Sequence, residues 1–256
     1  MYKIPELDKL PEFFHAFSSR EDGNMANSIN GKVVNFQEVI KNRKKFLEKN
    51  DIGINKCICM WVTHSDKVIV ADDKFAGLSM RNYNYARRVD GLVTNKKGLY
   101  LFLLVADCLP IILYDPVKEV IGLVHAGWKG VDKEIVKKAI VKMSKYYESE
   151  PQNIVVGIGP FAHKESFVKE NPSQINDARW KPFLKRRNSG ENQYKVDLVG
   201  FMRKQLSDSG ILEKNLFISE VDTVTDKGFF SHVREGKLSL AKQGRFVCIV
   251  GLKTTS

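Results

Sequence analysis

The turn Asp115-Pro116-Val117-Lys118, which joins two apolar runs, constrains the fold of this sequence most strongly. Proline suits the second position of a β-turn, where φ is about −65°. We therefore expect an antiparallel hairpin in which the first and last residues of the turn pair. In that register Cys108 lies opposite His125, and directly opposed residues share one face of a sheet. Pro110 cannot donate to the ladder, which predicts a sheet edge or a bulge near the Cys-His end.

The rest of the chain mixes helical and extended patterns. Helices are expected over Asn35 to Asn50, over Val131 to Tyr147 and from near Asp197, and strands over Phe13 to Ser19, Cys57 to Thr63, Lys67 to Val70, Val89 to Asn95, Leu99 to Val105, Ile154 to Ile158, Leu216 to Ser219 and Arg245 to Val250. This order favours an α+β fold with mixed β-sheets flanked by helices over a doubly wound parallel sheet. No repeat or Pro/Gly/Ser-rich linker divides residues 1–256, so we expect a single layered domain.

Composition excludes several classes of protein. Hydrophobic residues make up 43% of the 256 residues and charged residues 28%, which is typical of a globular chain and not of a disordered one. The longest apolar run, Leu99 to Ala106, is far shorter than the roughly 20 residues that cross a bilayer. The first ten residues carry four charges where a signal peptide has an apolar core. We therefore expect a cytoplasmic protein with no membrane partner and with its four cysteines as free thiols.

The net charge of +11 raises the question of a nucleic-acid partner. The basic residues are scattered, and their densest clusters, Arg43-Lys44-Lys45, Arg87-Arg88 and Lys185-Arg186-Arg187, accompany no recognition-helix or aromatic-platform motif. A solvated basic surface is the simpler interpretation, and no nucleic-acid partner is expected. The standard glycine-rich nucleotide loops are also absent.

A Cys and a His on one face allow two kinds of chemistry. They can act as a thiolate nucleophile with its base, or as two ligands of a borderline-soft cation such as Zn²⁺. A third ligand would distinguish these, and His64 is the leading candidate because it ends an apolar strand and precedes Ser65-Asp66. Spacing alone leaves open whether His64 is a ligand or an ordinary hydrogen-bonded residue.

The sequence around these residues resembles a known family. The motifs are His64, Ala106-Asp107-Cys108-Leu109-Pro110-Ile111, His125-Ala126-Gly127-Trp128-Lys129-Gly130 and Gly157-Ile158-Gly159-Pro160, with weaker matches at Phe17-Ser18-Ser19-Arg20, Asn42-Arg43, Asp90-Gly91 with Thr94, Phe229-Phe230-Ser231-His232 and Gly244-Arg245. They resemble the laccase-domain (multicopper polyphenol oxidase, YfiH-like) family of purine nucleoside phosphorylases. The resemblance runs over nearly the whole chain.

The resemblance implies a zinc-dependent enzyme. His64, Cys108 and His125 would bind zinc, and three protein ligands leave a fourth position for water or substrate. The implied reactions are phosphorolysis of adenosine, inosine, guanosine and methylthioadenosine, together with adenosine deamination. Cys108 and His125 are then also catalytic candidates, and Asp107 is the candidate for proton transfer. The expected partners are purine nucleosides and phosphate, and the chain is expected to be a monomer or a homodimer.

Phosphate needs cationic or backbone N–H partners. The basic positions that match the family are Arg20, Arg43 and Lys129. Lys129 also precedes the helix expected from Val131, where unpaired N–H groups favour anions. We therefore expect these three residues to bind phosphate.

The chain departs from the family pattern in three motifs, at Val62, Ser65, Asp222 and Val233. The family often has Gln-Val-His-Gly where this chain has Val62-Thr63-His64-Ser65, Cys-Thr where it has Asp222-Thr223, and Arg-Arg where it has Val233-Arg234. These differences bear on substrate preference and rate more than on the metal.

Three alternative functions stay open. A copper-dependent polyphenol oxidase is one, although the histidines outside the trio, His15, His163 and His232, are few for a multicopper cluster. A metal-free hydrolase that uses Cys108 and His125 is the second, and a basic nucleic-acid-binding module is the third. The usual zinc-deaminase signature is absent, so any deamination here must use a different site design.

Overall fold

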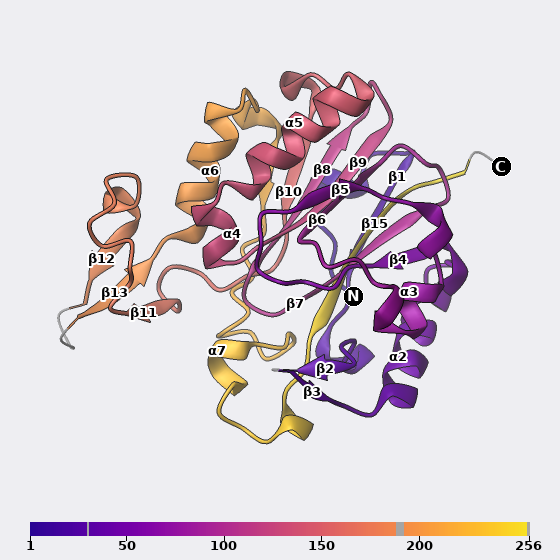
Figure 1. Cartoon of the computed structure of the whole chain (residues 1–256), viewed down its shortest axis with the longest axis horizontal. Helices are drawn as coiled ribbons and strands as arrows, with labels where there is room; N and C mark the ends of the chain where they lie inside the picture. Colours follow the sequence, from indigo (N-terminus) through magenta and orange to yellow (C-terminus); the bar gives the residue numbers. More distant parts are fainter. Residues whose placement is uncertain (30, 188–191, 255–256) are drawn as a thin grey trace.

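A computed structural model of the chain describes residues 1–29, 31–187 and 192–254. Two large mixed β-sheets pack face to face, and helices cover their outer faces (Figure 1). The six-stranded sheet has the order β14 (Leu216–Ile218), β10 (Val155–Ile158), β8 (Leu109–Asp115), β9 (Val120–Ala126), β6 (Gly91–Thr94), β5 (Val68–Val70). The four-stranded sheet has the order β1 (Phe13–Phe17), β15 (Phe246–Leu252), β7 (Tyr100–Val105), β4 (Cys57–Cys59).

Two smaller sheets and seven α-helices complete the described part of the chain. The smaller sheets are β11 (Val168–Glu170), β13 (Gln193–Val196), β12 (Leu184–Arg186), and β2 (Ser28–Ile29) with β3 (Lys32–Val33). The helices are α1 (Pro5–Asp8), α2 (Phe36–Glu48), α3 (Leu78–Arg81), α4 (Trp128–Asp132), α5 (Ile135–Tyr147), α6 (Leu198–Asp208) and α7 (His232–Glu235). None of the helices in these described ranges is long and apolar enough to cross a membrane.

The alternation of side chains along β8 explains the layers. Ile111 and Leu113 belong to the core under α5 and α6, whereas Ile112 and Tyr114 belong to the core between the two large sheets. Successive strand residues point to opposite faces, so a strand that is buried on both sides is apolar throughout. β7 alternates in the same way between the inter-sheet core and the core under α2. The predicted α+β architecture of mixed sheets flanked by helices is confirmed.

The register predicted for the central hairpin is wrong. His125 lies opposite Pro110 rather than Cys108, and Asp115 lies opposite Val120. The register differs by two residues, which is a full side-chain period, so Cys108 still shares the face of His125. The prediction of a sheet edge or a bulge is also wrong, because β8 lies between β10 and β9 and pairs with β9 without interruption from Leu109 to Asp115. Pro110 is the second residue of β8. The backbone N–H that proline lacks is therefore missing only near the end of the strand.

The turn of this hairpin explains the difference in register. Residues 116–119 form a four-residue loop, and Glu119 adopts a left-handed backbone conformation with φ of 50°. The carboxylate of Asp115 accepts hydrogen bonds from the backbone N–H groups of Val117 (2.9 Å) and Lys118 (3.1 Å). An aspartate side chain that accepts a hydrogen bond from the backbone N–H two residues ahead stabilises a turn of its own. The turn here is therefore longer than the one that Pro116 alone predicts.

The helix predicted over Val131 to Tyr147 is two helices. Glu134 adopts the left-handed conformation with φ of 56° and separates α4 from α5. The carbonyl of Val131 would accept from the backbone N–H of Ile135 in a continuous helix. It accepts instead from the backbone N–H of Glu134 (3.0 Å) and from Nε2 of Gln205 on α6 (2.8 Å). The Gln205 contact comes from a segment 74 residues away, so the apolar periodicity of the segment could not indicate it.

A buried histidine lies under the N-terminal segment. His15 on β1 accepts a hydrogen bond at Nε2 from the backbone N–H of Ile4 (2.8 Å) and stacks on the ring of Phe13. Its Nδ1 has no partner among the described residues. Burial lowers the pKa of His15 to about 4, while the opposite charges of Asp8 and Lys3 act against one another. His15 is therefore neutral in the folded protein at neutral pH.

We predict that His15 makes the fold sensitive to acid. The folded pKa lies below the unfolded value of about 6.5, so the unfolded chain takes up the proton first as the pH falls. His15 should therefore cost about 2 to 3 kcal/mol of stability between pH 7 and pH 4.5. Urea unfolding of wild type and His15→Gln at both pH values measures this. Equal losses in the two proteins would contradict the prediction.

Candidate metal centre

The three side chains predicted to be metal ligands meet at one point. The ligand atoms of His64, Cys108 and His125 all lie within 4.8 Å of one another. His64 lies in the loop after β4, Cys108 lies where the chain passes from β7 to β8, and His125 is the second-last residue of β9. The two imidazole rings meet edge to face, with centroids 4.9 Å apart.

Gly127 leaves the space that the three side chains fill. A Cβ atom at this position would lie 2.8 Å from Sγ of Cys108 and 3.2 Å from Cδ2 of His64. Carbon and sulfur do not approach that closely, so any larger residue would displace the cluster. The glycine that follows His125 and Ala126 is therefore a requirement of the packing around these donors.

The carboxylate of Asp90 holds two of the three donors in place. It is fully buried and accepts from Nδ1 of His125 (2.9 Å) and from the backbone N–H of His64 (2.9 Å). It also accepts from the backbone and hydroxyl groups of Thr63 and Ser65. Since Nδ1 of His125 is used by Asp90, Nε2 is the nitrogen left for a ligand. A carboxylate behind a histidine is the usual outer support of a metal-binding imidazole.

Charges within the cluster favour the thiolate form of Cys108. Burial opposes ionisation of this thiol, but the charge of His125 and its hydrogen bond outweigh burial and lower the pKa of Cys108 to about 6. Burial likewise lowers the pKa of His125, whereas Cys108 and Asp90 together raise it to about 9. The proton of this coupled pair thus resides on the imidazole. A deprotonated sulfur is the form that binds metal ions.

The donor set fits a borderline-soft metal ion. One thiolate and two imidazoles are typical zinc ligands. Sites with three protein ligands keep the fourth coordination position open for water or substrate. The open side faces a cavity of about 400 Å³, within the range of roughly 300 to 1,000 Å³ for small-molecule sites. The cluster could therefore hold a metal ion in contact with a bound substrate.

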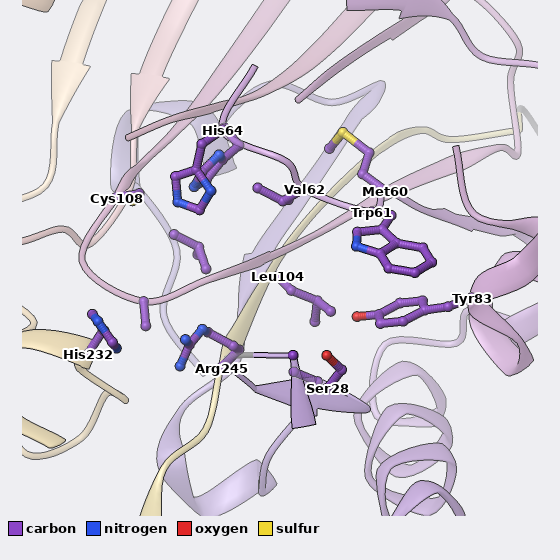
Figure 2. Close-up of a pocket in the computed structure, with 15 residues that line it drawn as sticks. Ser28, Met60, Trp61, Val62, His64, Tyr83, Leu104, Cys108, His232 and Arg245 are labelled. Carbon is purple, nitrogen blue, oxygen red and sulfur yellow. The ribbon is translucent and has the colours of Figure 1, made fainter. Parts of the chain in front are cut away.

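The cavity has a polar end and an apolar end (Figure 2). The rings of Trp61 and Tyr83 stack at a centroid distance of 5.3 Å and form the end away from the metal ligands. His232 and Arg245 lie at the other end. The described lining residues are Ala26, Ser28, Gly31, Met60, Trp61, Val62, His64, Tyr83, Leu104, Val105, Ala106, Cys108, His125, His232 and Arg245.

Asp107 is not among the described residues that line this cavity, and its carboxylate holds a neighbouring loop. Its backbone is left-handed, with φ of 74°. One carboxylate oxygen accepts from Oγ1 of Thr223 (2.7 Å), and the other accepts from the backbone N–H of Val233 (2.6 Å). Val233 is in α7, the helix that begins with His232. The predicted proton-transfer role of Asp107 stays a prediction, and the contacts indicate that Asp107 also positions α7.

The three residues predicted to bind phosphate lie apart. Arg20 pairs with Glu235 and stacks over a phenylalanine ring, and Arg43 is fully buried with Nε and Nη1 bonded to backbone carbonyl groups. Lys129 is exposed on α4. None of the three is among the described residues that line the cavity. Their phosphate-binding roles stay predictions.

The departures from the family pattern fall in and around the site. Val62 lines the cavity, and Ser65 donates to Asp90. Asp222 accepts from the hydroxyl of Ser166 and from the backbone N–H of Val224. Of these departures, Val62 alters the cavity surface directly.

Comparison with known proteins gives the relatives of this chain. The family described as multi-copper polyphenol oxidoreductase laccase matches residues 15–253. The chain belongs to this family. A purine nucleoside phosphorylase named YlmD from Bacillus subtilis (strain 168) is 30% identical, over 84% of this chain and 78% of the relative. Purine nucleoside phosphorylase LACC1 of Mus musculus is 32% identical over a matched region that covers 62% of this chain and 38% of that longer protein.

Two solved structures have the same fold as this chain. Hypothetical protein YfiH of Bacillus licheniformis is 26% identical and superposes with a TM-score of 0.85 over 96% of this chain and 95% of that one. YlmD from Geobacillus stearothermophilus has a TM-score of 0.85 at 24% identity, over 96% of this chain and 93% of that one. The names of the relatives support an enzyme related to purine nucleoside phosphorylases.

Two features of this site were not predicted from the sequence. Asp90 and Arg245 were noted as motif matches without a role, because neither is adjacent in sequence to a candidate ligand. Asp90 is 35 residues from His125, whose ring it holds. The one available signal was the Asp90-Gly91 pair at the start of a predicted strand, since strand ends gather at one edge of a sheet.

We predict that metal affinity depends on both the ligands and their support. Cys108→Ala removes one of three donors and should reduce the metal content after dialysis to well below one ion per chain. Asp90→Asn leaves fewer acceptors behind His64 and His125, so metal affinity should fall roughly 10- to 100-fold. Metal content and competition with a chelator measure the two effects.

Cys57→Ala is the matched control, because Cys57 is a buried cysteine of β4 outside the cluster. It should retain the metal of the wild-type protein. Equal metal content in wild type and Cys108→Ala would place the metal elsewhere.

Proposed function

We propose that this protein is a zinc-dependent purine nucleoside phosphorylase. Its substrates would be adenosine, inosine, guanosine and methylthioadenosine, with adenosine deamination as a second activity. The observation that carries the proposal is the His64, Cys108 and His125 cluster, which is open to a cavity large enough for a small-molecule ligand. Relatives named purine nucleoside phosphorylase at 30% and 32% identity support the same choice.

The residues of the chain have separable tasks in this proposal. His64, Cys108 and His125 would hold zinc, which supplies a Lewis acid at the side of the cluster that faces the cavity. Asp90 keeps the ring of His125 oriented and so fixes which nitrogen faces the metal. The apolar end with Trp61 and Tyr83 excludes water from a bound ligand and gives it a flat surface to contact.

Two other functions use the same cluster. A metal-free hydrolase would need only Cys108 and His125, and the placement of His64 beside them favours a metal instead. A copper-dependent polyphenol oxidase is suggested by the description of the family. Among the described residues this trio is the one group of three or more donors with metal-ligand spacing, and a multicopper cluster needs more imidazoles than two.

We propose that the protein works in the cytoplasm as a monomer or homodimer on nucleosides and phosphate. Its four cysteines are free, which suits a reducing compartment. Cys57, Cys59 and Cys248 are buried, so the one cysteine that borders the cavity is Cys108.

We predict that the metal-loaded protein converts adenosine and phosphate to adenine and ribose 1-phosphate. Without phosphate, the proposed second activity should give inosine instead. Product analysis by chromatography, with and without phosphate, distinguishes the two reactions. The Cys108→Ala variant should form neither product. Failure of the metal-loaded wild type on all four nucleosides, or dioxygen uptake with a phenol, would contradict the proposal.

We predict that Asp107→Asn retains the metal but lowers kcat about 10²- to 10⁴-fold for both reactions, because it removes a positioned proton-transfer group. The matched control is Asp115→Asn at the far end of β8, where the carboxylate holds a turn. It should leave kcat near the wild-type value. Metal loss in Asp107→Asn would show instead that the residue braces the site, and full metal with normal turnover would eliminate both roles.

A further inference from the structure

Arg245 presents a guanidinium group to the cavity from a rigid backbone. The residue directly precedes β15. Its backbone N–H donates to Oδ1 of Asn24 (2.9 Å), and its carbonyl accepts from the backbone N–H of Met25 (3.0 Å). Nη1 donates to the carbonyl of Gly244 at 2.7 Å. These bonds fix where the guanidinium lies before any ligand binds.

The guanidinium of Arg245 has no carboxylate partner among the described residues. Nearby, Arg20 and Arg234 both pair with Glu235, whereas no ion pair within residues 1–29, 31–187 and 192–254 includes Arg245. Of its five N–H donors, one has a protein acceptor. Burial lowers the pKa of Arg245, because the group has lost hydration. A desolvated cation of this kind is stabilised by an anion that completes its hydrogen bonds.

The surroundings of Arg245 favour a small oxyanion. Figure 2 shows Arg245 between His232 and Ser28 on the cavity wall. Burial and the charge of Arg245 lower the pKa of His232, so this imidazole is neutral at neutral pH and keeps one N–H donor. A hydroxyl, an imidazole and a guanidinium fork together offer donors of the kind that phosphate oxygens accept. Arg245 is the one Lys or Arg among the described lining residues.

We propose that Arg245 binds the inorganic phosphate that takes part in the reaction, and that His232 and Ser28 complete this phosphate subsite. The proposal rests on the proposed function, since it assigns phosphate to the cavity beside the metal ligands. It moves the subsite away from Arg20, Arg43 and Lys129, which do not line the cavity.

The subsite suits the bond changes of phosphorolysis. A phosphate oxygen forms the new bond to C1′ of the ribose, while the bond from C1′ to N9 of the purine breaks. The purine leaves with the electron pair of that bond and takes up the proton that hydrogen phosphate gives up. Arg245 would hold the phosphate beside the nucleoside, so that the oxygen and C1′ are already close.

Arg245→Gln tests the subsite by removing the charge and the fork. The Kd of inorganic phosphate, measured by calorimetry without nucleoside, and the phosphate KM at saturating inosine should both rise about 10- to 100-fold. The KM of inosine should change less than about threefold. Arg245→Lys keeps the charge without the fork and should recover part of the phosphate affinity. Arg186→Gln on exposed β12 is the matched control and should behave as wild type.

The outcomes separate this proposal from the proposed function. Suppose that the wild-type protein cleaves no nucleoside but binds phosphate, and that Arg245→Gln binds phosphate less tightly. The phosphate subsite then stands, and the phosphorylase function fails. If wild type binds no phosphate, or Arg245→Gln binds it as tightly, the subsite is wrong whatever the enzyme cleaves. A parallel titration with adenosine 5′-monophosphate covers the other source of a phosphate group. Weaker nucleotide binding with unchanged inorganic phosphate binding would also overturn the proposal.

Thermal melting and metal content show whether the variants are folded. If Arg245→Gln unfolds, Arg245→Lys still decides the question. A folded Lys variant should bind phosphate measurably less tightly than wild type, and phosphate affinity equal to that of wild type would count against the guanidinium fork.

Discussion

The buried carboxylate of Asp90 is the interaction on which the candidate metal centre depends. Burial of a charged group is costly unless hydrogen bonds compensate for the lost water, and here His125 together with residues 63–65 supplies them. His64 follows β4 of the four-stranded sheet, while His125 lies on β9 of the six-stranded sheet. One carboxylate thereby couples the two sheets at the point where the donors must meet.

The sandwich of sheets explains why the centre lies where it does. Cys108 occupies the short passage in which the chain leaves β7 of one sheet and enters β8 of the other. The cavity extends from this passage to Trp61 and Tyr83 on one side and to Arg245 at the start of β15 on the other. A rigid, fully buried core on both sides of the passage keeps these groups at fixed separations.

Local patterns predicted most of the elements, and long-range contacts decided the exceptions. The apolar run of residues 109–115 predicted a strand, but the Asp115 side chain set the width of the turn and with it the register. The apolar period after Val131 predicted one helix, but Glu134 is left-handed, and the Val131 carbonyl accepts from Glu134 and from the distant Gln205 instead of from Ile135. The three-stranded sheet of β11, β12 and β13 was not predicted, because its short strands carry several charged residues and little apolar alternation.

The sequence by itself determined the donor set, because the motifs around His64, Cys108 and His125 specify residue types that bind metal. It also determined the continuous apolar runs that allow both faces of the central strands to be buried. The tertiary structure alone decided that Asp90 stands behind His125, that Asp107 turns toward α7, and that Arg245 faces the cavity without a carboxylate partner. Those relations join residues 35 to more than 100 positions apart, and no local periodicity or propensity encodes which distant groups meet.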